Sequence, residues 1–318
     1  MKLIVPEYFK AFRCKGGSCS DNCCIGGEID IDEKTQEKYA ALKTPLGERI
    51  KKNTAKEEGV CHFILLGERC PFLNSQNLCD IIIEKGEDYL CDICREHPRY
   101  YLTLGERVFG GVGLACEEAA RLILENPLPH AYAELKTEAE YEECDEELLA
   151  LFLDLRKEIL KIFASKKQTL VYTVEMLKKS VLKAQRAADG TPETPCEIKD
   201  FSRDDLISVV EKLELLTPEM PTLLKKSPCP KNQTPKSENT NKYLHNLLLY
   251  FLDRYLPKAV EDGDFISKLN FALFSFSAIE QLFSAEEDLT LERAVYLSKL
   301  YSKEVEYNED NIYIITNA

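Results

Sequence analysis

Cysteine is the residue type with the clearest capacity for chemistry in this chain, since ten of its thirteen cysteines fall within the first 116 residues. Two close pairs stand out, the vicinal Cys23-Cys24 and the C-x-x-C of Cys91 and Cys94. A short local pair brings two sulfurs to one ion at little entropic cost, so this spacing predicts a metal site. The candidate ligands are Cys14, Cys19, Cys23, Cys24, Cys70, Cys79, Cys91, Cys94 and Cys116.

The type of metal follows only in part from the residues. Soft thiolate ligands select zinc, copper(I) or iron–sulfur clusters, and the composition leaves zinc and iron–sulfur both open. Adjacent residues of an extended segment point to opposite sides, so Cys23 and Cys24 can serve one ion only in a distorted loop. Gly26 and Gly27, just beyond the pair, permit such a loop. The remaining cysteines are expected to be small buried apolar side chains: Cys61, Cys144, Cys196 and Cys229.

The overall composition is that of an ordinary globular protein, with 318 residues, 44% hydrophobic and 30% charged. Its apolar runs are shorter than the ~20 residues that a membrane span needs. No signal peptide is evident in MKLIVPEYFKAF, so we expect a cytoplasmic location, where disulfides are uncommon. The net charge of -14 argues against a nucleic-acid partner and suits a basic protein partner.

The cysteine-rich part is expected to be a small irregular unit over residues 1–126 with little regular structure. EIDID at 28–32 alternates like one short strand, and a helix is expected over 33–43. YYLTLGERVFGG predicts a β-hairpin that turns at Gly105-Glu106. A short helix over 117–125 should stop at Asn126-Pro127, and FGGVGLAC at 109–116 is interpreted as a turn that delivers Cys116.

From residue 127 to 318 the pattern is that of a helical domain. ELLALFLDLRKEILKIF carries one apolar stripe at helical spacing, and the segments near 245 and 275 have the broad apolar faces of core helices. Asp264 and Thr290 are expected N-caps, the latter for a last helix ending near 305. Residues 217–242 are rich in Pro, Ser, Asn and Lys and predict a mobile loop. The expected fold class is therefore mainly α, with the cysteine-rich unit docked on a C-terminal helical domain.

Four N-terminal motifs in order resemble the flagellin lysine-N-methylase family. They are FRCKGGSCSDNCCIGGEIDID, CPFLNSQNLC, CREHPRYY and CEEAARLIL, and the segment from Asn241 to Phe276 also resembles that family's helical tail. Cysteine-cluster domains described as zinc- or iron-chelating share part of these motifs. One departure is Gly27, where the family often has an aromatic residue. The positions that match the family's cysteines are Cys14, Cys19, Cys23, Cys24, Cys70, Cys79, Cys94 and Cys116, and Cys91 is associated with one subgroup.

The resemblance implies that a methyl group passes from S-adenosylmethionine to lysine side chains of flagellin, with an iron–sulfur cluster held by the cysteines. The accepting amine must be neutral, and deprotonating a lysine at pH 7 costs about 4–5 kcal/mol. A base or desolvation must supply this energy. His97 and Tyr100, beside Arg99 and close to the C-x-x-C, are the candidates for acid–base or cofactor contacts. The sequence marks no S-adenosylmethionine site.

Two other classes of function remain open at this point. In one, the cysteines bind structural zinc and the helical half is a non-catalytic interaction module. In the other, exposed thiols of low pKa, such as Cys91 and Cys94, handle metal or electrons. Bound S-adenosylmethionine would support only the enzyme.

Overall fold

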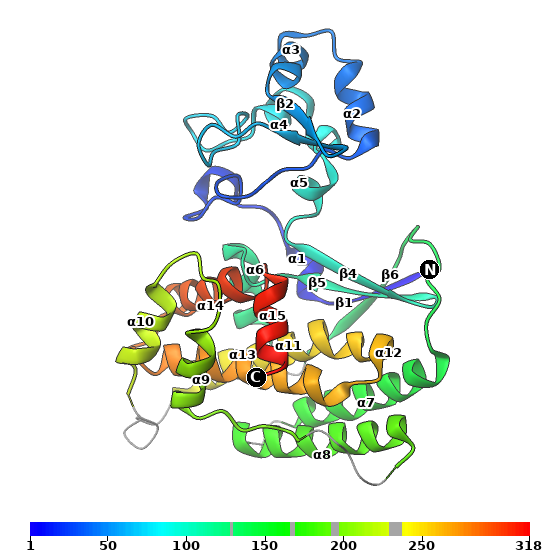
Figure 1. The fold of residues 1–318 in the computed structure, drawn as a ribbon, viewed down its shortest axis with the longest axis vertical. Coiled ribbons are helices and arrows are strands. Elements are labelled where there is room, and N and C mark those ends of the chain that lie inside the picture. The colour runs from blue at the N-terminus through cyan, green and yellow to red at the C-terminus, as the bar shows by residue number, and fades with distance from the viewer. Residues whose placement is uncertain (128–129, 166–168, 192–196, 229–236) are drawn as a thin grey trace. The chain divides into compact units, whose positions relative to one another are not determined.

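The structure is a computed structural model that describes residues 1–318 except 128–129, 166–168, 192–196 and 229–236. It divides into two compact units (Figure 1). The cysteine unit comprises residues 13–100 and 116–118, and the helical unit comprises residues 1–12, 101–115 and 119–318. The two units do not divide at the expected boundary of 126/127. The N-terminal strand and most of the hairpin belong to the same unit as the helices.

A four-stranded sheet in the order β4-β5-β1-β6 explains this division. Its N-terminal strand β1 (Lys2–Pro6) pairs in parallel with β5 (Arg107–Val112) and antiparallel with β6 (Tyr132–Lys136). The predicted hairpin is confirmed, since β4 (Arg99–Leu104) and β5 are neighbours and Gly105 turns between them at a φ of +59°. Gly110 and Gly111, expected in a turn, instead continue β5, so only residues 113–115 form the turn before Cys116.

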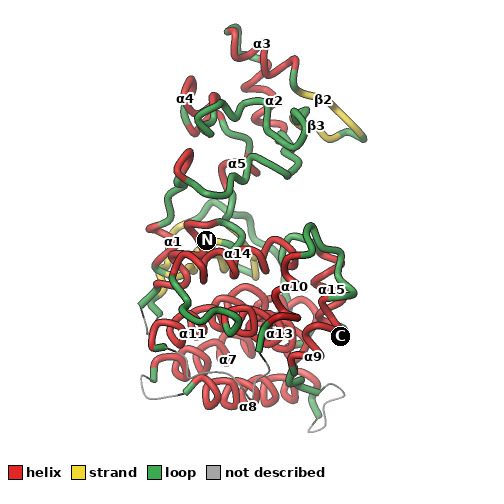
Figure 2. The backbone as a smooth tube through the Cα atoms, turned by 90° about the vertical axis from the view of Figure 1, so that its left-hand side faces the viewer, coloured by secondary structure: helices red, strands yellow, loops and turns green. Residues whose placement is uncertain are grey.

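Helices form most of the helical unit, which confirms the mainly α class (Figure 2). The central one is α13, whose buried residues lie on every side and which packs against α8, α11, α14 and α15. The α-helices are α1 (Tyr8–Ala11), α6 (Glu117–Glu125), α7 (Glu146–Ala164), α8 (Leu170–Asp189), α9 (Arg203–Val210), α10 (Glu219–Lys226), α11 (Glu238–Tyr255), α12 (Ala259–Asp262), α13 (Phe265–Phe283), α14 (Leu291–Val305) and α15 (Glu309–Thr316), with a 3₁₀ turn over Leu256–Lys258.

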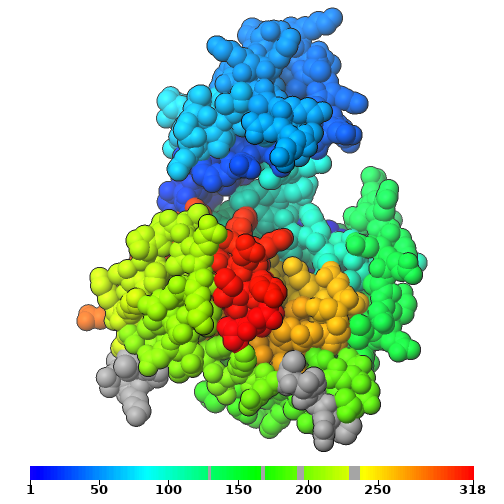
Figure 3. Space-filling view, in the orientation of Figure 1, coloured from blue at the N-terminus to red at the C-terminus, as the bar shows by residue number. Residues whose placement is uncertain are grey.

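The expected helix starts are confirmed by their caps. The Asp264 carboxylate accepts the Ser267 N–H at 2.9 Å, and the Thr290 hydroxyl accepts the Arg293 N–H at 3.2 Å. The helix that begins after Thr290 is not the last, however. A further helix, α15, lies at the surface in Figure 3, with Tyr313 exposed and Ile315 buried.

The predicted mobile loop over 217–242 is wrong at both of its ends. Helix α10 occupies its first part, because Met220 and Leu224 are spaced one turn apart and both are buried. Helix α11 begins at Glu238, with Ser237 as its N-cap. The centre of the segment, residues 229–236, lies outside the described residues.

The cysteine unit has short elements joined by loops. EIDID forms only an isolated bridge, Asp30 to His62, rather than a strand. The helix expected over 33–43 ends at Ala40, and the next begins at Pro45 within a turn so tight that a side chain at Gly47 would meet the Leu42 carbonyl. The elements are a 3₁₀ turn (Gly16–Ser18), α2 (Glu33–Ala40), α3 (Pro45–Lys52), β2 (Thr54–Glu57), β3 (Val60–Phe63), α4 (Asp80–Lys85), a 3₁₀ turn (Glu87–Tyr89) and α5 (Asp92–Glu96).

In the parts of the chain that the structure describes, no helix is both long and apolar enough to span a bilayer.

A buried carboxylate organises the core of the helical unit. The side chain of Glu306 is fully buried and accepts hydrogen bonds from the hydroxyls of Tyr250 and Tyr255, both at 2.9 Å, and of Ser302 at 2.5 Å. The Arg254 guanidinium lies 3.1 Å from the same carboxylate. Burial next to this negative charge raises the pKa of Tyr255 well above its usual value. The charge of Glu306 is thus fully compensated within the core.

We expect Arg254→Met to destabilise the helical unit by about 3 kcal/mol, because it leaves the buried Glu306 charge without its cation. Urea unfolding followed by far-UV circular dichroism measures this loss. The matched control is Arg121→Met, whose ion pair with Glu125 is 39% and 43% exposed. Removing that pair should cost no more than about 0.5 kcal/mol. Equal losses in the two variants would contradict the interpretation.

Candidate metal centre

A cluster of thiols lies in the apolar core of the cysteine unit. Cys70 and Cys91 are buried there with side chains such as Phe72, Ile81 and Phe63. Further cysteines pack against the same core, so sulfur supplies a large part of its interior. The structure therefore brings together five of the predicted ligands, called here the buried thiol group: Cys24, Cys70, Cys79, Cys91 and Cys94.

Backbone hydrogen bonds between loops place these thiols. The Cys70 N–H donates to the Cys24 carbonyl at 2.9 Å, which joins the vicinal pair to the CPFL segment. Leu73 and Cys79 form a bridge, so the chain returns to bring Cys79 near Cys70. Gly26, at a φ of +84°, supplies the distortion expected after the vicinal pair. A side chain at Gly27 would meet no atom within 4 Å, so the backbone there does not require glycine.

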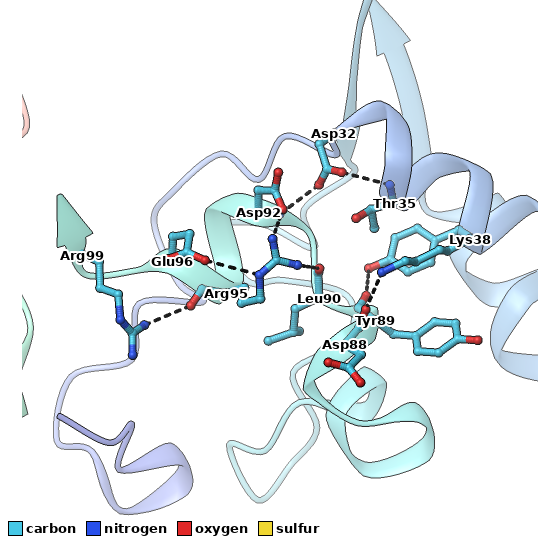
Figure 4. Close-up of polar contacts among 11 residues, drawn as sticks. Asp32, Thr35, Lys38, Asp88, Tyr89, Leu90, Asp92, Arg95, Glu96 and Arg99 are labelled. Atoms are coloured by element: carbon cyan, nitrogen blue, oxygen red, sulfur yellow. Dashed lines mark hydrogen bonds and ion pairs between the residues drawn. The ribbon is translucent and has the colours of Figure 1, made fainter. Parts of the chain in front are cut away.

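The C-x-x-C is held in place by α2 and by polar contacts around α5 (Figure 4). The Asp32 carboxylate caps α2 at Thr35 and also accepts the Asp92 N–H at 2.9 Å. Arg95 pairs with Asp92 and Glu96, which braces the single turn of α5. Cys91 is the N-cap of this turn, and Cys94 lies in it. The sequence pattern indicated the two cysteines but not Asp32 or Arg95. The only sequence signal for these two was an acid at the start of a helix and a base near the end of one.

Burial and neighbouring thiols shift the pKa values of the cysteines in this core. A hydrogen bond with Cys23, followed by burial, raises the pKa of Cys24, and the charges of Cys70 and Cys79 raise it further. Cys94 donates a hydrogen bond to Cys91, which raises the pKa of Cys94 and lowers that of Cys91. Burial likewise raises the pKa values of Cys70 and Cys79.

Two pairs of thiols are hydrogen-bonded, Cys24 with Cys23 and Cys94 with Cys91. Among the described residues, no three Cys, His, Asp or Glu side chains converge in an arrangement that could hold a metal ion. The donor chemistry nonetheless fits a soft metal, since five thiols share one shielded cluster. Binding would require loss of the thiol protons and rotation of side chains, as metal binding to cysteine does generally. The buried thiol group is therefore the part of the cysteine unit best suited to hold zinc or an iron–sulfur cluster.

Glu117, the first residue of α6, contacts the segment that carries Cys19. Its carboxylate accepts the Ser20 N–H at 2.8 Å, bonds the Ser20 hydroxyl and the Lys15 ammonium, and lies 3.8 Å from the Cys19 sulfur. Burial would raise the pKa of Glu117, but the hydrogen bonds from Lys15 and Ser20 lower it to about 2. The sequence prediction missed Glu117, whose only signal was its position after Cys116.

The candidate catalytic residues follow the C-x-x-C. His97 ends α5 and is half-buried, and Tyr100 is half-buried in β4. Arg99 donates to the Arg95 carbonyl at 3.2 Å, which ties this segment to α5 (Figure 4). A catalytic role for His97 and Tyr100 stays a prediction.

The four cysteines expected to be small buried side chains lie in different parts of the chain. Cys61, in β3, packs against the core of the cysteine unit. Cys144 is half-buried beside Gly105 in the helical unit, far along the chain from the candidate ligands. Cys196 and Cys229 lie outside the described residues.

The fold and the site together define the class of protein: a mainly helical chain with a separate unit whose core contains thiols. Comparison with known proteins shows which proteins the chain resembles. The chain is 32% identical over 140 residues to the flagellar biosynthetic protein FliU of Salmonella muenchen, a match that covers 42% of this chain and 82% of that protein. It belongs to the flagellin lysine-N-methylase family.

Two proteins named lysine-N-methylase, from Salmonella typhimurium and Salmonella choleraesuis, are each 31% identical over 137 residues. These matches cover 41% of this chain and only 34% of each lysine-N-methylase, so about a third of their length is represented. No family model matches the chain, and no solved structure matches it.

Thiol alkylation should follow the burial that the structure assigns. In metal-free, reduced protein we expect iodoacetamide to modify the exposed Cys14 and Cys23 first. Cys70 and Cys91 should react more slowly by about 100-fold or more, because both are buried and reaction requires local opening. Mass spectrometry of peptides after timed alkylation measures the order, with urea-unfolded protein as the control. Uniform rates in the folded protein would refute the buried thiol group.

Proposed function

We propose that the protein is a protein-lysine N-methyltransferase of the flagellin type, which uses S-adenosylmethionine and carries a cysteine-held iron–sulfur cluster. The observation that carries the proposal is the buried thiol group of a chain in the lysine-N-methylase family. The substrate would be a protein with accessible lysines, flagellin by analogy with the relatives. The net charge of -14 favours approach of such a basic segment.

The residues that would hold the cluster are those of the buried thiol group. Thiolates are the usual ligands of iron–sulfur clusters, and the apolar surroundings of Cys70 and Cys91 shield such a group from water. When bound, the cluster would supply an iron that can chelate the methyl donor. The protein's own part is to keep the thiols close in the folded state, which the loop hydrogen bonds around Cys24 and Cys70 do.

The transfer itself breaks the bond between the sulfonium sulfur and the methyl carbon and forms a bond from the lysine nitrogen to that carbon. S-adenosylhomocysteine leaves with the electron pair of the broken bond. The lysine must first lose a proton, and His97 is the candidate acceptor because an imidazole nitrogen can act as a general base. Tyr100 would orient the amine or the donor through its hydroxyl and ring.

The first test is anaerobic purification followed by measurement of iron, sulfide and zinc and of the visible spectrum before and after dithionite. We expect iron and sulfide in equal amounts and a brown chromophore that bleaches on reduction. S-adenosylmethionine binding is then measured by calorimetry, and methylation of purified flagellin by mass spectrometry. Zinc without a chromophore would contradict the iron–sulfur proposal and favour the non-catalytic zinc protein. Metal lost reversibly on mild oxidation, without donor binding, would favour the metal-handling protein.

His97→Asn should lower kcat for lysine methylation by about 100-fold or more, because it removes the proton acceptor. The loss should shrink as the pH rises toward the lysine pKa, where the amine is already neutral. The control is His62→Asn, a half-buried histidine of β3 in the same unit, which should leave kcat unchanged. An unchanged kcat in His97→Asn, or a loss independent of pH, would exclude His97 as the base.

A further inference from the structure

Arg49, a residue of α3, contacts both ends of the segment that carries Cys70 and Cys79. Its guanidinium donates a hydrogen bond to the Pro71 carbonyl at 2.7 Å and forms an ion pair with the Asp80 carboxylate at 2.6 Å. Pro71 directly follows Cys70, and Asp80 directly follows Cys79. One side chain therefore holds the two residues that lie next to these cysteines.

The position of Arg49 is set by the burial of its own helix. Leu46 and Ile50 of α3 are buried in the core of the cysteine unit, which fixes the rotation of the helix about its axis. The Arg49 guanidinium lies 5.1 Å from the centre of the Phe72 ring, which is fully buried in the same core. Because Pro71 is buried too, its carbonyl needs a hydrogen-bond partner, and a guanidinium can bond two acceptors at once in a fixed geometry.

The backbone of the segment closes on itself and keeps Cys70 close to Cys79. The Leu73 N–H donates to the Cys70 carbonyl at 3.1 Å, and Leu73 also pairs with Cys79 in an isolated bridge. The Asp80 N–H donates to the Phe72 carbonyl at 2.8 Å. Both cysteines contribute to the same apolar core. They therefore lie in one closed loop, to which α3 is bonded through a single side chain.

We propose that Arg49 is a positioning residue for Cys70 and Cys79, and that it holds this half of the buried thiol group independently of the C-x-x-C. The C-x-x-C has its own polar contacts, which come from Asp32 and Arg95 (Figure 4). The two halves of the buried thiol group therefore depend on different side chains. The use of these thiols for a cluster rests on the proposed function, whereas their positioning is a property of the chain alone.

The test is timed alkylation of the reduced, metal-free full chain with iodoacetamide, measured for each cysteine by mass spectrometry of peptides. In Arg49→Met, Cys70 should react about 10-fold faster or more than in the wild-type chain, and Cys79 faster as well, because the segment opens more often. Cys91 should keep its protection. Arg49→Lys should lie between the two, since an ammonium keeps the charge but not the fixed fork of donors. Lys52→Met, which changes an exposed residue of the same helix, is the matched control and should react as wild type.

Far-UV circular dichroism of each variant checks that the fold is kept, and Asp80→Asn provides a milder change if Arg49→Met does not fold. Unchanged protection of Cys70 and Cys79 in folded Arg49→Met and Asp80→Asn would overturn the proposal. An equal loss of protection at Cys91 would overturn the independence of the two halves.

The iron and sulfide content separates this proposal from the proposed function. After anaerobic purification, Arg49→Met should retain less of both than the wild-type chain or Lys52→Met, because a group that orients ligands has been removed. A wild-type chain without iron and sulfide, whose Cys70 still depends on Arg49 for protection, would refute the proposed cluster and leave the positioning role in place. A folded Arg49→Met chain with the wild-type content of iron and sulfide would overturn the role of Arg49 toward the cluster.

Discussion

The structure of the cysteine unit depends on one constraint: cysteine side chains must form part of its hydrophobic core. The helices here have at most eight residues and the only paired strands are β2 and β3, within the part of this unit that the structure describes. Few regular hydrogen bonds therefore stabilise it, and side chains such as Cys70, Cys91 and Phe72 must fill its interior. A metal that binds only the folded form would stabilise this unit further by mass action. The stability of the unit and the state of its sulfurs are consequently linked.

The helical unit differs from the cysteine unit, because its core is made of large apolar side chains. Helix α13 is buried on nearly all sides, and α11 packs along it with residues such as Leu247, Phe251 and Tyr255. One set of polar side chains in this core surrounds Glu306, which accepts hydrogen bonds from the hydroxyls of Tyr250 and Tyr255.

Local signals decided which parts of the fold could be predicted. Helix α6, the hairpin at Gly105 and the N-caps Asp264 and Thr290 depend on neighbouring residues, and all were predicted. The pairing of β1 with β5 was not, because a strand of five residues carries no information about a partner 100 residues away. The boundary expected at 126 differed from the observed units for this reason.

The same limit applies to the candidate site. The cysteine spacing predicted which residues could be ligands, and five of them share a cluster. The sequence did not predict the role of Glu117, an acid whose contacts with Lys15 and Ser20 join segments about 100 residues apart. No periodicity or spacing marks such a contact. Propensity alone would interpret Glu117 as a favourable charge in the first turn of a helix.

The order of the strands has a consequence for the chain as it leaves the ribosome. Lys2 pairs with Arg107 and with Lys136, so β1 emerges first and has no strand partner until the whole stretch from 13 to 100 has been made. Chains fold as they are synthesised, and that stretch holds nearly all of the cysteine unit. We therefore expect the sulfur-rich interior to form before the sheet closes. Residues 116–118 arrive last, so Cys116 joins a unit whose other thiols are already in place.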